Sequence, residues 1–418
     1  MKRIALAAML GMLALAPAQA QTTVTYLNIN VNENDQKLFQ EAAQEYMAAN
    51  PGVTVEMPVL ENEAFKSKLT TLLQSPDAPD VFHSWGGGVF ADQVKAGVLR
   101  PIDDLLTPEA REAEGEAGVA HFTGPDGHIY GIARNVQGVM LWYNKKLLDQ
   151  AGVDPASLST WDGLLAGVQK LKDAGIAPIA LGGKDKWPAQ FWWAYLIIRN
   201  AGHDGFNAAM AGENGGFNNP EVIHAGDMLA QLAALNPWQD GYLAASLGDA
   251  CGAFGDGKAA LHLQGEWIYN CQIENAADGK GIGDDNLGIM PFPSIEGGKG
   301  QATDSLGGME GYVFTKSAED EAVKFIEWFN GKDIQTKMAA NSVYIPITKG
   351  AADALPNKFH AQIAAMAGSS TWHQLFFDQT LGADVGGQFN DLALELASGD
   401  TDGADAAARL EEAVATIR

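Results

Sequence analysis

The chain has 418 residues and a formal net charge of −25 at pH 7. Its length is too great for one hydrophobic core and indicates two large lobes, at roughly 100 to 200 residues per domain. The negative charge argues against nucleic acid or an anionic membrane surface as a partner, because both repel an acidic protein, and favours a neutral or cationic small ligand.

The N-terminal segment has the pattern of a secretory signal over residues 1–20. Lys2 and Arg3 precede an apolar run over residues 4–16, and small residues follow at Ala18 and Ala20. No later stretch reaches the roughly 18 apolar residues of a membrane helix, and no cysteine follows the signal to carry a lipid. We therefore expect a soluble periplasmic protein without a lipid anchor.

Strands and helices alternate in the segment that follows. Extended runs at residues 24–31, 53–59 and 80–83 are separated by amphipathic helical runs that begin near Asn34 and Glu63. This order predicts an α/β fold with an open, mainly parallel sheet covered by helices on both faces. Ligands of such sheets gather at the carboxyl ends of the strands.

Several residues near those strand ends are candidates for ligand contact. Glu33 follows the first strand, and Trp85 and Gly86 follow the third. The glycines at 86–88 can let backbone N–H groups approach a ligand hydroxyl, or they can form only a tight turn. Lys66, on the second helix, can reach the cleft or lie on a solvated helix face.

Three later extended runs are candidates for crossings between the lobes, at residues 136–143, 287–293 and 344–347. We predict an N-terminal lobe of residues 21–134 and 302–346, and a C-terminal lobe of residues 135–301 and 347–418. Asn135 and Asp304 lie near these boundaries, where both lobes meet, and are candidate ligand contacts.

The two cysteines of the chain are Cys251 and Cys271. An oxidising compartment permits a disulfide between them, which is worth about 3 kcal/mol in the chain-entropy model. The alternative is a pair of inert buried thiols. In both cases the cysteines have a structural role.

Five motifs occur in one order along the chain. They are PDVFHSWGGG with VKAGVLRPIDDLL within residues 79–106, GVMLWYNKKLLDQAGV at 138–153, FGDGKAALHLQGEW at 254–267, GGMEGYVF at 307–314 and YIPITKGA at 344–351. Together they resemble the extracellular solute-binding proteins (family 1 type) of carbohydrate ABC importers, in the oligosaccharide-binding branch. The resemblance implies two α/β lobes joined by three hinge crossings, which close on a sugar and deliver it to inner-membrane permease subunits. It also implies a monomer without a cofactor.

A sugar offers apolar C–H faces and a rim of hydroxyls, so its site needs flat aromatic rings and fixed polar groups. We predict that Trp85 and Trp267, each beside glycine at a strand end, contact the ligand. Trp372 and Trp187, at loop positions, stay open between ligand contact and core.

The segment LFFDQ supplies another candidate pair, Phe377 and Asp378. A carboxylate accepts charge-assisted hydrogen bonds from hydroxyls, and in oligosaccharide-binding relatives a similar aromatic–Asp pair contacts the sugar. The alternative is that the segment caps a helix.

Other chemistries are poorly supported. GAFGDGK at residues 252–258 has phosphate-loop spacing, but Ala259 stands where a Ser or Thr must hold magnesium. The histidines never fall at metal-ligand spacing, and no G-x-S-x-G turn occurs. We therefore expect no metal, cofactor or catalytic residue. The competing hypotheses are an exported carbohydrate-cleaving hydrolase or lyase, and a chemoreceptor adaptor. The aromatic content favours a di- or oligosaccharide and leaves a monosaccharide or polyol open.

Overall fold

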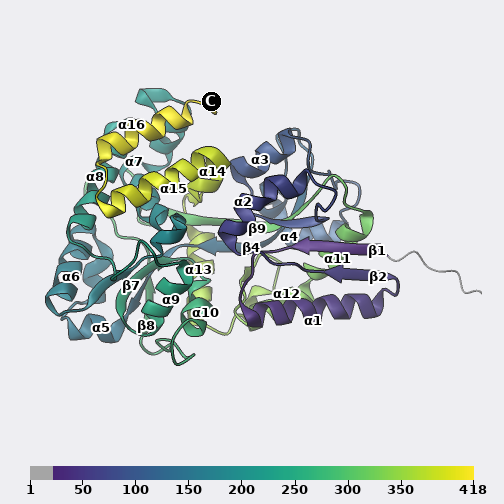
Figure 1. Ribbon diagram of the computed structural model, residues 1–418, viewed down its shortest axis with the longest axis horizontal. Helices are drawn as coiled ribbons and strands as arrows, with labels where there is room; N and C mark the ends of the chain where they lie inside the picture. The colour runs from purple at the N-terminus through teal and green to yellow at the C-terminus, as the bar shows by residue number, and fades with distance from the viewer. Residues whose placement is uncertain (1–21) are drawn as a thin grey trace, which may run out of the picture.

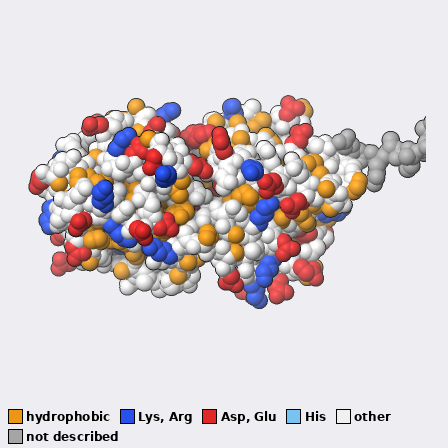
Figure 2. Space-filling view, turned by 90° about the horizontal axis from the view of Figure 1, so that it is seen from below, with side chains coloured by type: hydrophobic (Ala, Val, Ile, Leu, Met, Phe, Trp, Pro, Cys, Tyr) orange, Lys and Arg blue, Asp and Glu red, His pale blue; other side chains and the backbone are white. Residues whose placement is uncertain are grey.

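The computed structural model describes residues 22–418 and has two lobes, each built on its own β-sheet (Figure 1). The predicted signal sequence lies outside these residues. In the space-filling view the lobes are two rounded masses, and acidic side chains are spread over the surfaces of both (Figure 2). Among residues 22–418 we find no helix with the length and apolar character needed to cross a membrane.

The first lobe contains a seven-stranded sheet in the order β10–β4–β9–β3–β1–β2, with β11 also paired to β9. Its strands are β1 (Thr22–Leu27), β2 (Val53–Glu56), β3 (Val81–Ser84), β4 (Gly131–Gly138), β9 (Ser305–Phe314), β10 (Ile345–Pro346) and β11 (His373–Leu375). As predicted, β1 pairs in parallel with both β2 and β3. However, β9 runs antiparallel to β3 and to β4, so the prediction of a mainly parallel sheet is wrong beyond the third strand. The reason is that β9 enters from the other lobe and therefore begins at the edge where β1 and β3 end.

Helices cover both faces of this sheet. They are α1 (Glu33–Ala49), α2 (Asn62–Leu73), α3 (Gly87–Lys95), α4 (Pro108–His121), α11 (Asp320–Phe329) and α12 (Lys332–Ala340). Alternate strand residues face opposite layers, as the pleat requires. Val81 belongs to the core cluster with α1 and α11, whereas its neighbour Phe82 belongs to the cluster with α2 and α3.

The second lobe contains a four-stranded sheet in the order β6–β7–β5–β8. Its strands are β5 (Met140–Asn144), β6 (Ala177–Ala180), β7 (Ala259–Gln264) and β8 (Leu287–Met290). Its α-helices are α5 (Lys145–Gln150), α6 (Trp161–Asp173), α7 (Trp187–Met210), α8 (Pro220–Ala234), α9 (Leu247–Gly255), α10 (Ile268–Glu274), α15 (Ala383–Ser398) and α16 (Gly403–Val414). Four short 3₁₀ helices occur at η1 (Pro155–Ser159), η2 (Gly183–Asp185), η3 (Glu213–Gly215) and η4 (Ala352–Ala354). Two further helices, α13 (Lys358–Ser369) and α14 (Phe377–Thr380), lie between the lobes (Figure 1).

Three chain segments pass between the two sheets. The apolar run that we predicted as one strand over residues 136–143 is two strands in different sheets, because β4 ends at Gly138 and β5 begins at Met140. The second passage leads from β8 to β9. The third follows β10, which pairs with β4, and leads to α13, which packs against the core of the second lobe before β11 returns to the first sheet. The sheets do not follow the predicted boundaries at every point. Residues 135–138 and β11 belong to the first sheet, because the crossing strands extend past the junction.

A disulfide joins α9 to α10 in the second lobe. Cys251 and Cys271 are bonded, with their Cα atoms 5.7 Å apart and a sequence separation of 20. Cross-linking a loop of this length stabilises a fold by about 3 kcal/mol in the chain-entropy model. The bond therefore fixes α10, which begins directly after Trp267.

Candidate functional site

Trp85 forms part of the first lobe's wall at the carboxyl end of β3. Its ring is half-buried, 4.4 Å from the ring centroid of His83 and 5.9 Å from that of Phe65. Lys66 on α2 holds its ammonium 5.4 Å from the indole centroid, within reach of a cation–π interaction. Trp85 also packs against the core cluster of the second lobe, so it lies at the junction.

Lys66 forms an ion pair with Asp378 on α14. Nζ of Lys66 lies 3.1 Å from Oδ2 of Asp378, which also accepts a hydrogen bond from Nδ2 of Asn390 at 3.4 Å. The backbone N–H of Asp378 donates to Oε1 of Gln190 at 3.2 Å. Burial raises the pKa of Asp378, but the charge of Lys66 and these hydrogen bonds outweigh it and leave the pKa below its usual value. The pair is therefore charged at neutral pH and links α2 to α14.

A second group of aromatic rings surrounds Trp267, directly after β7. Its ring centroid lies 6.1 Å from Trp187 and 6.3 Å from Phe376. The indole N–H of Trp267 donates to Oε1 of Gln264 at 3.1 Å. Nε2 of Gln264 and Nε1 of Trp187 are buried and have no hydrogen-bond partner within the described residues. Flat rings beside unpaired donors suit a ligand with apolar faces and hydroxyl oxygens.

The glycines after Trp85 serve packing between segments. The N–H of Gly86, which we considered for ligand binding, donates to Oγ of Ser84 at 3.1 Å. The residue has φ = 76°, and a Cβ placed there would clash with the ring of His121. A Cβ at Gly88 would lie only 2.6 Å from the carbonyl oxygen of Thr380. The tight-turn alternative is thus favoured for Gly86, and the glycines let α3 approach the segment after α14.

Two of the predicted contacts lie in structural positions. Phe377 is fully buried and packs on Phe206 and Phe389, so its side chain belongs to the core of the second lobe. Asp304 accepts the backbone N–H of Gln301 at 2.6 Å, which makes it part of the turn before β9.

Trp372 is half-buried, and its ring lies 4.9 Å from that of His203 and 5.5 Å from that of Phe206. These contacts place Trp372 at the C-terminal part of α7, whereas Trp187, one of the rings around Trp267, is the first residue of α7.

Asn135 belongs to a buried polar network on β4 and β9. Its Oδ1 accepts from Nε of Arg134 at 3.0 Å, while its Nδ2 has no partner within residues 22–418. Arg134 pairs with Glu310 at 2.5 Å, and Gln137 donates to the other oxygen of Glu310 at 2.8 Å. Burial raises the pKa of Glu310, but its interactions with His83 and with the charge and hydrogen bond of Arg134 together leave the pKa below its usual value. Burial lowers the pKa of neighbouring His83 to about 3, so this imidazole is neutral.

Glu266 brings a second carboxyl to the junction from the end of β7. Its Oε2 accepts a hydrogen bond from the backbone N–H of Gly138 at 3.2 Å, at the residue where the chain leaves the first sheet. Its carbonyl oxygen lies 3.1 Å from Nε2 of His360. Burial, together with the nearby charge of Glu310, raises the pKa of Glu266 to about 8. At neutral pH this carboxyl is therefore mainly protonated.

Glu33 marks another edge of the junction. It is exposed at the first residue of α1, and its charge, after burial, contributes to the raised pKa of Glu274 at the end of α10. Asp35, two residues further along α1, has a buried carboxyl whose Oδ1 has no partner within the described chain. Burial raises the pKa of Asp35 to about 7.

The structure thus brings together Lys66, Trp85 and Asp378, and it surrounds Trp267 with aromatic rings. Sequence reasoning missed Phe376, whose ring lies beside Trp267, whereas the predicted contact Phe377 packs in the core of the second lobe. The turn of chain before α14 decides which of the two rings lies beside Trp267, and no periodic pattern in the sequence signals it. In the sequence, the buried network of Arg134 and Glu310 is indicated only by charged residues within apolar strands. Among residues 22–418, no three His, Cys, Asp or Glu side chains are grouped in a way that could hold a metal ion.

Comparisons with known proteins agree with this architecture. Residues 30–336 match the model of the bacterial extracellular solute-binding protein family. The chain is 27% identical over 238 residues to an uncharacterized ABC transporter extracellular-binding protein of Pyrococcus horikoshii, covering 56% of this chain and 53% of that protein. It is 26% identical over 329 residues to the maltotriose-binding protein of Pyrococcus abyssi, covering 74% of this chain and 63% of that protein. The chain thus spans about half to two thirds of the length of these two relatives.

Two solved structures share the fold. A chitin oligosaccharide binding protein superposes with a TM-score of 0.84 at 26% identity, covering 95% of this chain and 98% of that one. A protein from a study of xylan utilization by Caldanaerobius polysaccharolyticus has a TM-score of 0.87 at 23% identity, covering 93% and 99% of the two chains. Similarity at this coverage extends to both lobes and to the passages between them.

Proposed function

Because the chain belongs to the bacterial extracellular solute-binding protein family, we propose that it is a receptor that binds a sugar between its lobes and delivers it to an ABC permease. The observation that carries the sugar assignment is the group of rings around Trp267, with the unpaired donors of Trp187 and Gln264 beside it. Indole rings stack on the C–H faces of a sugar, and buried N–H groups can donate hydrogen bonds to its hydroxyl oxygens. The ion pair of Lys66 and Asp378 supplies further polar groups near Trp85.

A di- or oligosaccharide is the favoured ligand. Aromatic residues lie both at the end of β3 and after β7, so the site offers more than one stacking surface. The printed names of two similar proteins, the maltotriose-binding protein and the chitin oligosaccharide binding protein, support the same class. A monosaccharide is the alternative, and the length of the sugar is decided by the binding measurements below.

The receptor proposal includes a location and a mode of action. The protein acts in the periplasm as a monomer, holds its ligand in a closed arrangement of the lobes and releases it unchanged. Sugar contacts to both lobes would favour closure, because a ligand shifts a conformational equilibrium by its differential affinity for the two states. The competing hypothesis of a hydrolase or lyase predicts new reducing ends after incubation with an oligosaccharide, whereas a receptor returns the sugar intact.

A thermal-shift screen against a panel of sugars tests the proposed function. We expect at least one di- or oligosaccharide to raise the melting temperature, because a ligand at about 100 times its Kd stabilises the folded state by roughly 2.7 kcal/mol. Isothermal titration then gives the affinity, and a reducing-end assay on the same mixture tests for cleavage. A flat response across the whole panel contradicts the sugar assignment.

Trp267→Ala tests the position of the site. We expect it to weaken binding of the sugar found in the screen by ten-fold or more, about 1.4 kcal/mol, through the loss of a stacking surface. Trp328→Ala is the matched control, since Trp328 is also half-buried but packs on Tyr46 in the first lobe. Titration calorimetry measures both variants, and circular dichroism checks that each is folded. Equal affinities for the Trp267 variant and the original protein would remove Trp267 from the site.

A further inference from the structure

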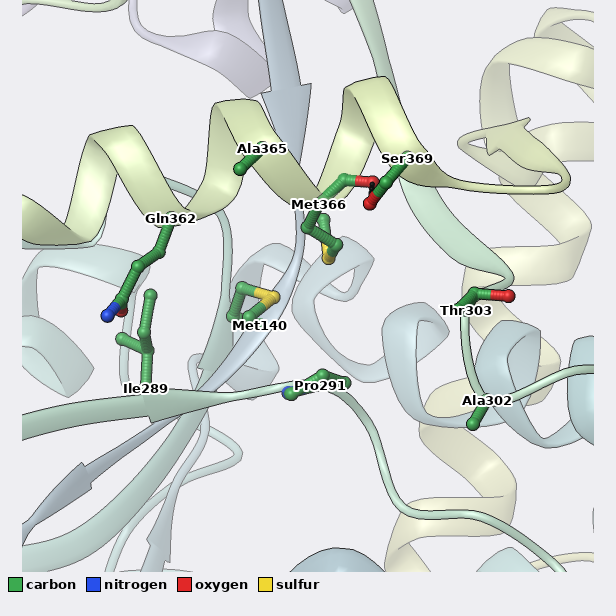
Figure 3. Close-up of a pocket in the computed structure, with 9 residues that line it drawn as sticks. All are labelled: Met140, Ile289, Pro291, Ala302, Thr303, Gln362, Ala365, Met366 and Ser369. Carbon is green, nitrogen blue, oxygen red and sulfur yellow. Dashed lines mark hydrogen bonds between the residues drawn. The ribbon is translucent and has the colours of Figure 1, made fainter.

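One pocket of the structure, which we call the hinge pocket, lies apart from the rings and charges described above. Its volume is about 390 Å³, and its lining includes Met140, Pro291, Thr303, Ala365 and Met366. Figure 3 shows α13 along one side of it, with the side chain of Met366 pointing from this helix toward Met140. None of its lining residues belongs to the candidate sugar site.

The walls of the hinge pocket come from the strands β5 and β8, from the passage between β8 and β9, and from α13. Met140 is the first residue of β5, directly after the chain leaves the first sheet. Pro291 and Thr303 lie in the passage from β8 to β9. Ala365 and Met366 belong to α13, which follows the third passage. A change in the angle between the lobes that moves α13 or the passage from β8 to β9 relative to β5 would therefore change the shape of this pocket.

The lining defines the chemistry of an occupant. Six of the nine lining residues are apolar, three are uncharged polar residues and none carries a charge. Two methionines adapt to irregular apolar shapes, because their side chains are unbranched and polarizable. The volume lies within the range of about 300–1,000 Å³ that is typical of small-molecule sites. These features suit a small uncharged molecule with an apolar body and a single polar group.

We propose that the hinge pocket binds a small, uncharged, mainly apolar molecule, and that its occupancy changes the affinity of the protein for sugar. An occupant that contacts β5, α13 and the passage from β8 to β9 stabilises the lobe arrangement in which the pocket has this shape. Sugar binding between the lobes acts on the same equilibrium, so the two sites are coupled. Linkage then requires that each ligand change the other's affinity by the same factor. The coupling rests on the proposed function, whereas the existence of the pocket site does not.

The probe for the site is 2-naphthol, which has two fused apolar rings and one hydroxyl group. In protein labelled with ¹³C at the methionine methyl groups, we expect 2-naphthol to shift the NMR signals of Met140 and Met366 in the absence of sugar. Met210 and Met228, which belong to the second lobe's own core, serve as internal references. If neither hinge-pocket signal moves up to the solubility limit of the probe, the site is refuted whether or not the protein binds sugar.

Two variants of α13 test the coupling. Ala365→Phe places a ring in the pocket from an exposed position, and Ala361→Phe adds the same ring at an exposed position of that helix outside the pocket lining. We expect A365F to weaken binding of 2-naphthol at least ten-fold and to change the sugar Kd at least three-fold, while A361F changes neither. Saturating 2-naphthol should change the sugar Kd of the original protein, but not that of A365F. A sugar Kd that is the same with and without 2-naphthol, and the same in A365F, refutes the coupling.

The two proposals fail in different ways. Absence of sugar binding by the original protein refutes the proposed function and the coupling, while the methionine signals still decide whether the pocket binds 2-naphthol. Sugar binding without any shift of Met140 or Met366 leaves the receptor function standing and overturns the hinge pocket as a site.

Discussion

Arg134→Met is expected to lower the free energy of unfolding by about 3–5 kcal/mol, because it leaves a buried carboxylate without its cation. The guanidinium pairs with Glu310 at 2.5 Å and also donates to the hydroxyl of Tyr26 at 3.3 Å. It lies 4.7 Å from the ring centroid of Tyr344, so it joins β1, β4, β9 and the start of β10. Methionine keeps much of the apolar stem but supplies neither charge nor donors. Urea denaturation of the original and variant proteins measures the difference.

A double variant and a surface control separate the loss of the pair from general damage. Adding Glu310→Gln to the Arg134 variant removes the unpaired charge and should restore part of the lost stability. Arg409→Met breaks an exposed pair with Glu395 and should cost no more than about 1 kcal/mol. A loss below 1 kcal/mol for Arg134→Met, or no recovery in the double variant, would show that the network does not hold a charged pair.

Glu266→Gln is expected to change how stability depends on pH. Burial, with the charge of Glu310, raises the pKa of Glu266 from its ordinary value of 4.5 to about 8. Between these two values the folded protein keeps a proton that the unfolded chain releases, so the contribution of this group is fully present below pH 4.5 and declines as pH rises toward 8. The slope for one proton is about 1.4 kcal/mol per pH unit. Glutamine does not titrate and still offers an oxygen to the N–H of Gly138.

The comparison between the two proteins isolates this effect. The free energy of unfolding of the Glu266 variant, relative to the original protein, should rise steadily from pH 5 to pH 8 and level off above it. Buried histidines such as His262, whose pKa burial lowers to about 3, act in the opposite direction, but they are present in both proteins and cancel. Glu395→Gln controls for the loss of one acidic side chain at the surface. Parallel stability profiles for E266Q and the original protein would contradict the raised pKa.

These two residues also bear on the receptor mechanism. Arg134 and Glu310 lie on the long strands that carry the chain out of the first lobe, and Glu266 reaches Gly138 from the second lobe. The buried ion pair and the hydrogen bonds around it would hold the start of the first crossing in one place. Movement of the lobes is then confined to the passages beyond it, where the hinge pocket lies.

Much of the architecture was predictable because it depends on local patterns. Period-two and period-3.6 apolar spacing identified the first three strands and the helices between them, and the parallel pairing of β1 with β2 and β3 followed from their order. The two-lobed family fold was recognisable from five motifs. Trp85, Lys66 and Asp378 were candidates because their residue types suit a sugar. Trp85 also follows a predicted strand, and Lys66 lies on a predicted helix. Their roles in sugar binding remain predictions.

The sequence does not determine side-chain directions that depend on distant contacts. Phe376 and Phe377 are adjacent and chemically identical, yet the first packs near Trp267 and the second on Phe389. Only the docking of α14 against α15 and α3 selects between them. The sequence leaves the glycine turn after Trp85 open between ligand contact and a tight turn, and the tertiary structure favours the turn, because the space at Gly86 is taken by His121, a residue 35 positions later in the chain.

The sequence by itself determined the order of the elements, the two-lobed family fold and the presence of aromatic and polar residues suited to a sugar. These properties depend on short-range periodicity, turn residues and motif order, all of which are local in the chain. Only the tertiary structure decided that Lys66 meets Asp378, that Arg134 and Glu310 form a buried pair, and that β5, α13 and the passage from β8 to β9 line one pocket. Such contacts join residues far apart in sequence. Their energies depend on burial and on the exact approach of neighbouring elements, which no local pattern contains.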